Sequence, residues 1–200
     1  MALTRELYRA FEDTIGPEYV SEDPVILDSY AWRMNRPETK FVPRFEAVTL
    51  PDSTEQVQAI VKLCNKYKVQ FKASSTGWGF FGDPGGPGVV KIDLRRMNRI
   101  LEINEKNMYA VVEPYVIFAE LQAELMKRGL NCNITGAGSN CSALPVAAHQ
   151  GLGHLSISGS YAERNQLALE WVTPDGEIVR LGSLGSLDEW WCGDGPGRRP

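Results

Sequence analysis

The sequence predicts a fold of mixed helices and strands, and three observations support this. A strand–helix–strand pattern occupies residues 46–73, a second group of strands with one helix occupies residues 88–129, and a hairpin pattern occupies residues 167–182. Two glycine-rich stretches separate these groups. The length of 200 residues suits one substantial domain or two small lobes.

The composition argues against several classes of function. Hydrophobic residues make up 43% of the chain and charged residues 23%, which is ordinary for a globular protein. A net charge of −4 does not favour binding to nucleic acid or to an anionic membrane. No run approaches the roughly 20 apolar residues of a membrane-spanning helix. The charged N-terminus lacks the apolar core of a signal peptide, so we expect a cytoplasmic protein.

The cysteines and histidines do not form a metal-binding pattern. The four cysteines, Cys64, Cys132, Cys141 and Cys192, are widely spaced and include no CxxC pair. The two histidines, His149 and His154, have no companion ligands nearby in the sequence. We therefore expect free thiols and no bound metal.

Residues 1–40 are predicted to form a helix followed by an irregular arm. Apolar residues between Leu3 and Phe11 share one helical face, which predicts a helix from Thr4 to Thr14 that ends at Gly16-Pro17. The stretch from residue 23 to residue 44 mixes aromatic, proline and charged residues. We interpret it as an arm lying over the domain surface.

The strand–helix–strand pattern is the clearest local signal. Glu46 to Leu50 is a short strand, and Ser53 with Gln56 fits a capping box that opens a helix. The apolar face of this helix has i, i+3, i+4, i+7 spacing at Val57, Ile60, Val61 and Cys64. Val69 to Ala73 returns as a strand and leads into the first glycine-rich stretch.

The remaining elements follow from similar patterns. "GVVKIDL" is predicted to be a buried strand, and two further strands are hinged at Asn104 to Asn107. An amphipathic helix begins near Phe118 and ends at Gly129. The second glycine-rich stretch, residues 131–164, is expected to be rich in loops. The hairpin of residues 167–182 turns at Pro174-Asp175-Gly176.

The stretch from Lys72 to Gly88, "KASSTGWGFFGDPGGPG", holds six glycines and two prolines. Within it, Ser74 to Gly79 offers several backbone N–H groups and three hydroxyls, and such nests bind anions such as phosphates. The pattern is neither a Walker loop nor a Rossmann GxGxxG motif. From spacing alone, a phosphate cradle and a glycine-rich surface loop both remain open.

Five segments, taken in order, resemble one family. They are "VTLPDSTEQVQAIVKLCNKYKV", "KASSTGWGFFG", "VVKIDLRRMNRILEINEKNMYAVVEPYVIFAELQAEL", "HQGLGHLSISG" and "LEWVTPDGEIVRLG". Together they resemble the FAD-binding domain of the vanillyl-alcohol oxidase / p-cresol methylhydroxylase flavoprotein superfamily, from about Phe41 to Gly197.

The resemblance implies an α+β fold of two subdomains with FAD threaded between them. Residues 41–200 would form the FAD-binding domain. Its first subdomain would span residues 41–103, with the pyrophosphate loop at residues 72–88, and an incomplete second subdomain would span residues 104–200. The resemblance also implies that the C-terminal part of the flavin domain and the cap domain are absent.

The resemblance assigns cofactor contacts to several residues. The pyrophosphate would be held by Ser74, Ser75, Thr76, Gly77, Trp78 and Gly79. The flavin or its ribityl chain would be approached by Ser142, Gly151, Gly153 and His154. Ile178 would meet the adenine through its main chain. The chain departs from the family pattern at Tyr115, where glycine is common, and at Ser142-Ala-Leu-Pro145-Val146, where the family often has SxxGN.

The resemblance implies FAD held without a covalent bond. Family members that attach the flavin through this domain use a histidine in the pyrophosphate loop or a cysteine in the second stretch. The loop here has no histidine, and Cys141 is not at a clear attachment position. His154 would pack beside the flavin, or else serve as a hydrogen-bonded structural residue. Trp190 and Trp191 are expected in the core or an interface.

The function implied by the resemblance is that of a flavin-dependent oxidoreductase. It would oxidise an alcohol or a 2-hydroxy acid by hydride transfer to flavin N5, with no catalytic base assigned. The alternatives are a non-catalytic subunit that holds FAD or relays electrons, and a structural module whose flavin site has decayed. Because the cap domain would be missing, we expect a second chain as partner, either another copy or a complementary subunit.

Overall fold

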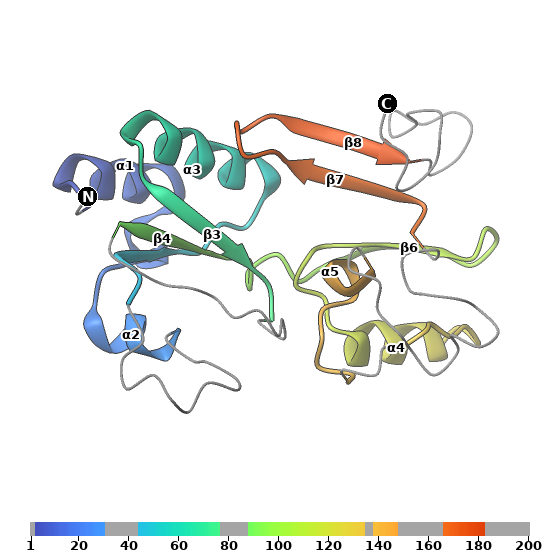
Figure 1. The fold of residues 1–200 in the computed structure, drawn as a ribbon. Coiled ribbons are helices and arrows are strands. Elements are labelled where there is room, and N and C mark those ends of the chain that lie inside the picture. Colours follow the sequence, from blue (N-terminus) through green and yellow to red (C-terminus); the bar gives the residue numbers. More distant parts are fainter. Residues whose placement is uncertain (1–2, 31–43, 77–87, 135–137, 148–165, 183–200) are drawn as a thin grey trace, which may run out of the picture. The chain divides into compact units, whose positions relative to one another are not determined.

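The computed structural model describes residues 3–30, 44–76, 88–134, 138–147 and 166–182 (Figure 1). The chain divides into two compact units. The first contains Met1–Arg96 with Pro174–Glu177, and the second contains Met97–Thr173 with Ile178–Pro200. Each unit has a cluster of buried apolar side chains of its own.

The first unit is built on a four-stranded sheet. The strands are β1 (Val20–Ser21), β2 (Ala47–Thr49), β3 (Gln70–Ser74) and β4 (Val89–Asp93), in the order β1-β2-β4-β3. β2, β4 and β3 run parallel, and β1 pairs antiparallel with β2. β4 lies between two parallel neighbours, which accounts for its run of buried residues. The predicted strands near residues 46–50, 69–73 and 88–94 are confirmed.

Two helices cover one face of this sheet (Figure 1). Both α1 (Arg5–Ile15) and α3 (Thr54–Tyr67) begin after a capping hydroxyl. Thr4 Oγ1 accepts from Leu7 N at 3.2 Å, and Ser53 Oγ accepts from Gln56 N at 3.3 Å. Each helix buries one apolar face. The helix predicted from Thr4 and the N-cap at Ser53 are therefore confirmed, while the Gln56 side chain of the predicted capping box accepts instead from Asp52 N at 2.9 Å.

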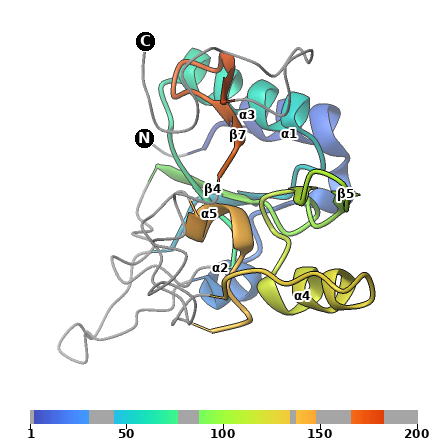
Figure 2. The same ribbon diagram turned by 90° about the vertical axis from the view of Figure 1, so that its right-hand side faces the viewer.

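The interpretation of residues 23–44 as an irregular arm is wrong at its start, because α2 (Pro24–Ser29) forms there. Asp23 Oδ1 accepts from Val25 N at 2.7 Å, and proline is suited to the first helical position. Leu27 packs with Phe45 and Val48. The helix α2 lies on the sheet face opposite α1 and α3 (Figure 2). Residues 31–43 of the arm lie outside the described residues.

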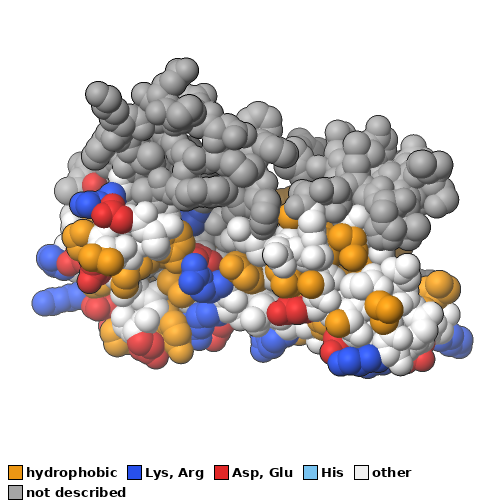
Figure 3. Space-filling model, turned by 90° about the horizontal axis from the view of Figure 1, so that it is seen from below, with side chains coloured by type: hydrophobic (Ala, Val, Ile, Leu, Met, Phe, Trp, Pro, Cys, Tyr) orange, Lys and Arg blue, Asp and Glu red, His pale blue; other side chains and the backbone are white. Residues whose placement is uncertain are grey.

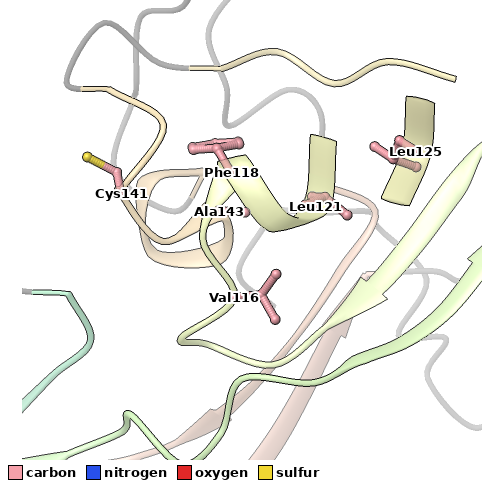
Figure 4. Close-up of a cluster of buried hydrophobic side chains, with 6 residues drawn as sticks. All are labelled: Val116, Phe118, Leu121, Leu125, Cys141 and Ala143. Carbon is pink, nitrogen blue, oxygen red and sulfur yellow. The ribbon is translucent and has the colours of Figure 1, made fainter. Parts of the chain in front are cut away.

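The second unit contains the antiparallel pair β5 (Ile100–Asn104) and β6 (Tyr109–Val112), followed by α4 (Phe118–Met126). Gly129 follows α4 with φ +71°, as predicted. The core of this unit is a buried cluster that runs along α4 and includes residues before and after it (Figure 4). Its members are Val116, Phe118, Leu121, Leu125, Cys141 and Ala143.

Two further elements of the second unit come from the C-terminal half of the sequence. A short helix, α5 (Ala143–Ala147), forms inside the stretch that we interpreted as rich in loops. β7 (Ala168–Val172) and β8 (Ile178–Gly182) form the predicted antiparallel hairpin. Its turn contains Gly176 at φ +81°, a conformation that favours glycine.

The described surface shows no separation of charge by sign on the face in Figure 3, where acidic and basic side chains are interspersed. This agrees with the modest net charge of the chain. Within the described ranges, no helix combines the length and the apolar character that crossing a membrane requires.

Candidate cofactor-binding site

The candidate site of the first unit lies at the carboxyl ends of its parallel strands. β2, β4 and β3 end at Thr49, Asp93 and Ser74, and the register pairs Ser74 with Asp93. Parallel strands place their carboxyl ends along one edge of the sheet, and ligands of open α/β sheets bind beyond that edge. The stretch Ser74 to Thr76 therefore begins where a ligand is expected.

The backbone at this edge is held by the neighbouring strand. Leu94 N donates to Ser74 O at 3.0 Å, which continues the pairing of β3 and β4 past the end of β4. Ser74, Ser75 and Thr76 are all partly buried. Three successive hydroxyl side chains thus follow a fixed strand end, and this arrangement can donate to an anionic ligand.

Asp93 organises the turn that follows β4. This carboxylate is only 2% exposed. Its Oδ2 accepts from Tyr30 Oη and from Arg95 Nε, both at 2.7 Å, and its Oδ1 accepts from Arg95 N at 2.9 Å. Arg95 Nη2 also lies 3.0 Å from Tyr30 Oη. The negative charge of Asp93 is balanced by a guanidinium, so it presents little repulsion to an anion at the same edge.

Lys91, on the central strand β4, is buried with 1% of its surface exposed. Its Nζ lies 5.2 Å from the centroid of the Phe45 ring and 5.8 Å from that of Tyr30. Burial lowers the pKa of Lys91 to about 8; the negative charge of Asp93 opposes this shift, and the positive charges of Lys72 and Arg95 add to it.

Sequence reasoning missed this lysine because it treated "GVVKIDL" only as a buried strand. A charged residue in the middle of an apolar parallel strand was the available signal.

In the second unit, Ser142 is 2% exposed and directly precedes α5. It forms an isolated bridge with Ile117, and the amide of the next residue, Ala143 N, donates to Val116 O at 2.8 Å. Ile178 is the first residue of β8 and pairs with Val172. Ser142 and Ile178 therefore lie at the ends of regular elements, and backbone pairing with neighbouring segments holds each of them in place.

The other predicted cofactor residues lie outside the described residues. These are Gly77, Trp78, Gly79, Gly151, Gly153 and His154. Of the predicted set, the structure brings Ser74, Ser75 and Thr76 together in the first unit. It describes Ser142 and Ile178 within the second unit.

The described cysteines are shielded thiols. Cys64, Cys132 and Cys141 are free, and burial raises the pKa of each, that of Cys64 to about 12. Cys132 Sγ lies 3.2 Å from Gln122 Oε1. Among the described residues, no group of three or more His, Cys, Asp or Glu side chains is arranged to hold a metal ion.

The comparisons with known proteins agree on one family. A family model for the FAD binding domain matches residues 45–182. D-2-hydroxyglutarate dehydrogenase of Stutzerimonas stutzeri is 32% identical, over 70% of this chain and 31% of its own length. The 4-cresol dehydrogenase flavoprotein subunit of Pseudomonas putida is 30% identical, over 70% of this chain and 27% of its own length.

The fold agrees as well. The structure of 4-ethylphenol oxidase from Gulosibacter chungangensis superposes with a TM-score of 0.77 at 32% identity, covering 92% of this chain and 36% of the oxidase. The chain thus spans about a third of the length of these relatives. The α+β fold of the p-cresol methylhydroxylase type is confirmed. The chain belongs to the FAD-binding domain family, in the vanillyl-alcohol oxidase / p-cresol methylhydroxylase superfamily of flavoproteins.

Proposed function

We propose that this chain is the FAD-binding portion of a flavin-dependent oxidoreductase that oxidises an alcohol or a 2-hydroxy acid. Membership of the FAD-binding family supports the cofactor. The name of one relative, a D-2-hydroxyglutarate dehydrogenase, supports the 2-hydroxy acid class, and the name of another, a 4-cresol dehydrogenase, supports oxidation of a small organic substrate more generally.

The observation that carries this proposal is the strand end at Ser74. FAD contains a diphosphate, which needs N–H and O–H donors and a site without uncompensated carboxylates. Ser74, Ser75 and Thr76 supply three hydroxyls at the carboxyl edge of the sheet, and the neighbouring Asp93 is already paired with Arg95. The described residues therefore fit the diphosphate.

The proposed contacts divide into three groups. The diphosphate would be held by Ser74, Ser75, Thr76, Gly77, Trp78 and Gly79. The flavin or its ribityl chain would be approached by Ser142, Gly151, Gly153 and His154. The main chain of Ile178 would meet the adenine, and its position at the start of β8 fixes that backbone.

When bound, FAD supplies a two-electron acceptor for a hydride from the substrate. The residues of this chain would bind and orient the cofactor. The buried thiol of Cys141, whose pKa is raised by burial, stays protonated near neutral pH and is a poor nucleophile. This supports FAD held without a covalent bond.

A second candidate is a subunit that holds FAD or relays electrons without oxidising a substrate itself. The name of the 4-cresol dehydrogenase flavoprotein subunit supports it, because that relative is itself one subunit of an enzyme. Under either proposal we expect a second chain as partner, either another copy or a complementary subunit.

Anaerobic reduction distinguishes the two candidates. The FAD-loaded chain is mixed with a panel of alcohols and 2-hydroxy acids, and its visible flavin absorption is followed. Loss of the flavin colour with one substrate class supports the oxidoreductase. Colour that persists with every substrate, both in the chain alone and in the chain together with any protein that co-purifies with it, but is lost on adding dithionite, contradicts the oxidoreductase and supports the FAD-holding subunit.

A further inference from the structure

Three basic side chains converge near the carboxyl end of β3 and β4. The register pairs Lys72 with Lys91 and Ser74 with Asp93. Side chains two residues apart on a strand lie on the same face of the sheet. One face of the sheet therefore carries Lys72, Ser74, Lys91 and Asp93. Arg95 joins this group because it forms an ion pair with Asp93.

Among the described residues, three charged groups act on the pKa of Lys91. The carboxylate of Asp93 raises it, and the cations of Lys72 on β3 and Arg95 after β4 lower it. The Tyr30 phenol, at the end of α2, donates to Asp93, and the Phe45 ring centroid lies 5.2 Å from the Lys91 ammonium. Burying a lysine ammonium costs free energy through desolvation even where it has partners, and the lowered pKa of Lys91 reflects that cost.

Lys91 lies close to the candidate site at Ser74–Thr76. Ser74 lies two residues beyond Lys72, which pairs with Lys91 across the sheet. At ordinary strand spacings, the Cα atoms of Lys91 and Ser74 are therefore about 8 Å apart. A unit charge at that range acts on an anion appreciably, because the intervening protein screens less than water does.

We propose that Lys91, reinforced by Lys72 and Arg95, is an electrostatic positioning residue that draws a diphosphate to Ser74–Thr76. This inference rests on the proposed function, since it takes the diphosphate of FAD as the ligand. Lys91 would not touch the ligand. It would act through the field that it places at the strand end.

The proposal makes FAD affinity depend on pH in a defined direction. Because the pKa of Lys91 is lowered to about 8, its charge is present near neutral pH and lost in mildly alkaline solution. The diphosphate of FAD keeps its negative charges throughout. Affinity is therefore expected to fall about three- to tenfold between about pH 7 and about pH 9.5.

The test is a fluorescence titration of the 200-residue chain with FAD at both pH values. Lys91→Met keeps most of the length of the side chain and removes its charge. It is expected to bind FAD about three- to tenfold more weakly than the wild type at about pH 7, and to lose most of the pH dependence. Lys66→Met is the matched control, since Lys66 is an exposed lysine at the end of α3, and it is expected to match the wild type.

Riboflavin, which lacks the diphosphate, serves as the matched ligand and is expected to bind both proteins alike at both pH values. If Lys91→Met binds FAD as tightly as the wild type, with the same pH dependence, the role of Lys91 is overturned while FAD binding stands. If the wild type binds no FAD at either pH, both this inference and the proposed function are overturned.

Discussion

Replacing Gly182 with alanine is expected to destabilise the second unit by about 4 kcal/mol. Gly182 has φ +96°, a backbone conformation that residues with a Cβ rarely adopt. A Cβ built there would lie 2.1 Å from Leu167 O and 2.6 Å from Ala168 Cα. Because both atoms are backbone, relief requires the end of β8 to move away from the start of β7, which breaks the pairing of Gly182 with Ala168.

Gly129→Ala is the matched control for this effect. Gly129 also has a positive φ, +71°, but nothing lies within 4 Å of the added Cβ. Its cost is expected to be about 1 kcal/mol, from the backbone conformation alone. Urea unfolding followed by circular dichroism compares the two variants. If both variants are destabilised equally, the close approach of the Leu167 and Ala168 backbone is not the reason that position 182 requires glycine.

Replacing Lys91 with methionine is expected to stabilise the folded chain by about 2 to 3 kcal/mol near pH 7. The pKa of Lys91 is about 8 in the folded protein, against an ordinary value of 10.5. At neutral pH the folded protein therefore carries a buried ammonium at a cost that the unfolded chain does not bear. Methionine fills a similar volume between Tyr30 and Phe45 without that cost.

The gain from this substitution is expected to vanish with rising pH. Below about pH 8 the lysine is protonated in both states, so the full cost is present. Between about 8 and 10.5 the folded lysine is neutral while the unfolded one still binds a proton, and the stability of the wild type rises relative to the variant. The stability gap should therefore close across this window.

Unfolding in urea at a series of pH values measures that gap directly. Lys72→Met, on the neighbouring strand but exposed, is the control and should change stability by no more than about 0.5 kcal/mol. A Lys91→Met variant that is less stable than the wild type at neutral pH, or a gap that does not change with pH, would contradict the assigned environment of Lys91.

Much of the fold was predictable because local signals agree with the tertiary structure. The hydroxyl of Ser53 caps α3 as its spacing with Gln56 indicated, and Gly129 takes the left-handed conformation that ends a helix. The hairpin turn at Gly176 follows from its Pro-Asp-Gly sequence. In each case one or two residues decide the local conformation, and packing then reinforces it.

The helices missed in the sequence are short. Packing stabilises them, and they are too short to show a helical repeat of apolar residues. α2 spans six residues, too few for a helical repeat to show, although Asp23-Pro24 is a recognisable start signal. α5 spans five residues and contains Pro145. The burial of Lys91 depends on Tyr30 and Phe45, which are far from it in sequence and come together only in the folded unit.

The candidate site was predictable in part for a similar reason. Ser74 to Thr76 are predicted as cofactor contacts because they lie in the glycine-rich stretch that resembles the pyrophosphate loop of the family. Their place at the carboxyl edge follows from the parallel pairing of β3 with β4. The neighbouring Asp93–Arg95 pair and its bond to Tyr30 were not foreseen, since nothing in the local sequence relates residue 30 to residue 93.

The central claim, that this chain holds FAD without a covalent bond, is tested most directly by one spectrum. The purified chain is incubated with FAD, freed of excess cofactor by gel filtration, and its visible absorption is recorded before and after acid precipitation. We predict flavin bands that elute with the protein and pass into the supernatant after precipitation. Protein that elutes without flavin bands would contradict FAD binding by this chain, and bands that stay in the pellet would contradict the non-covalent attachment.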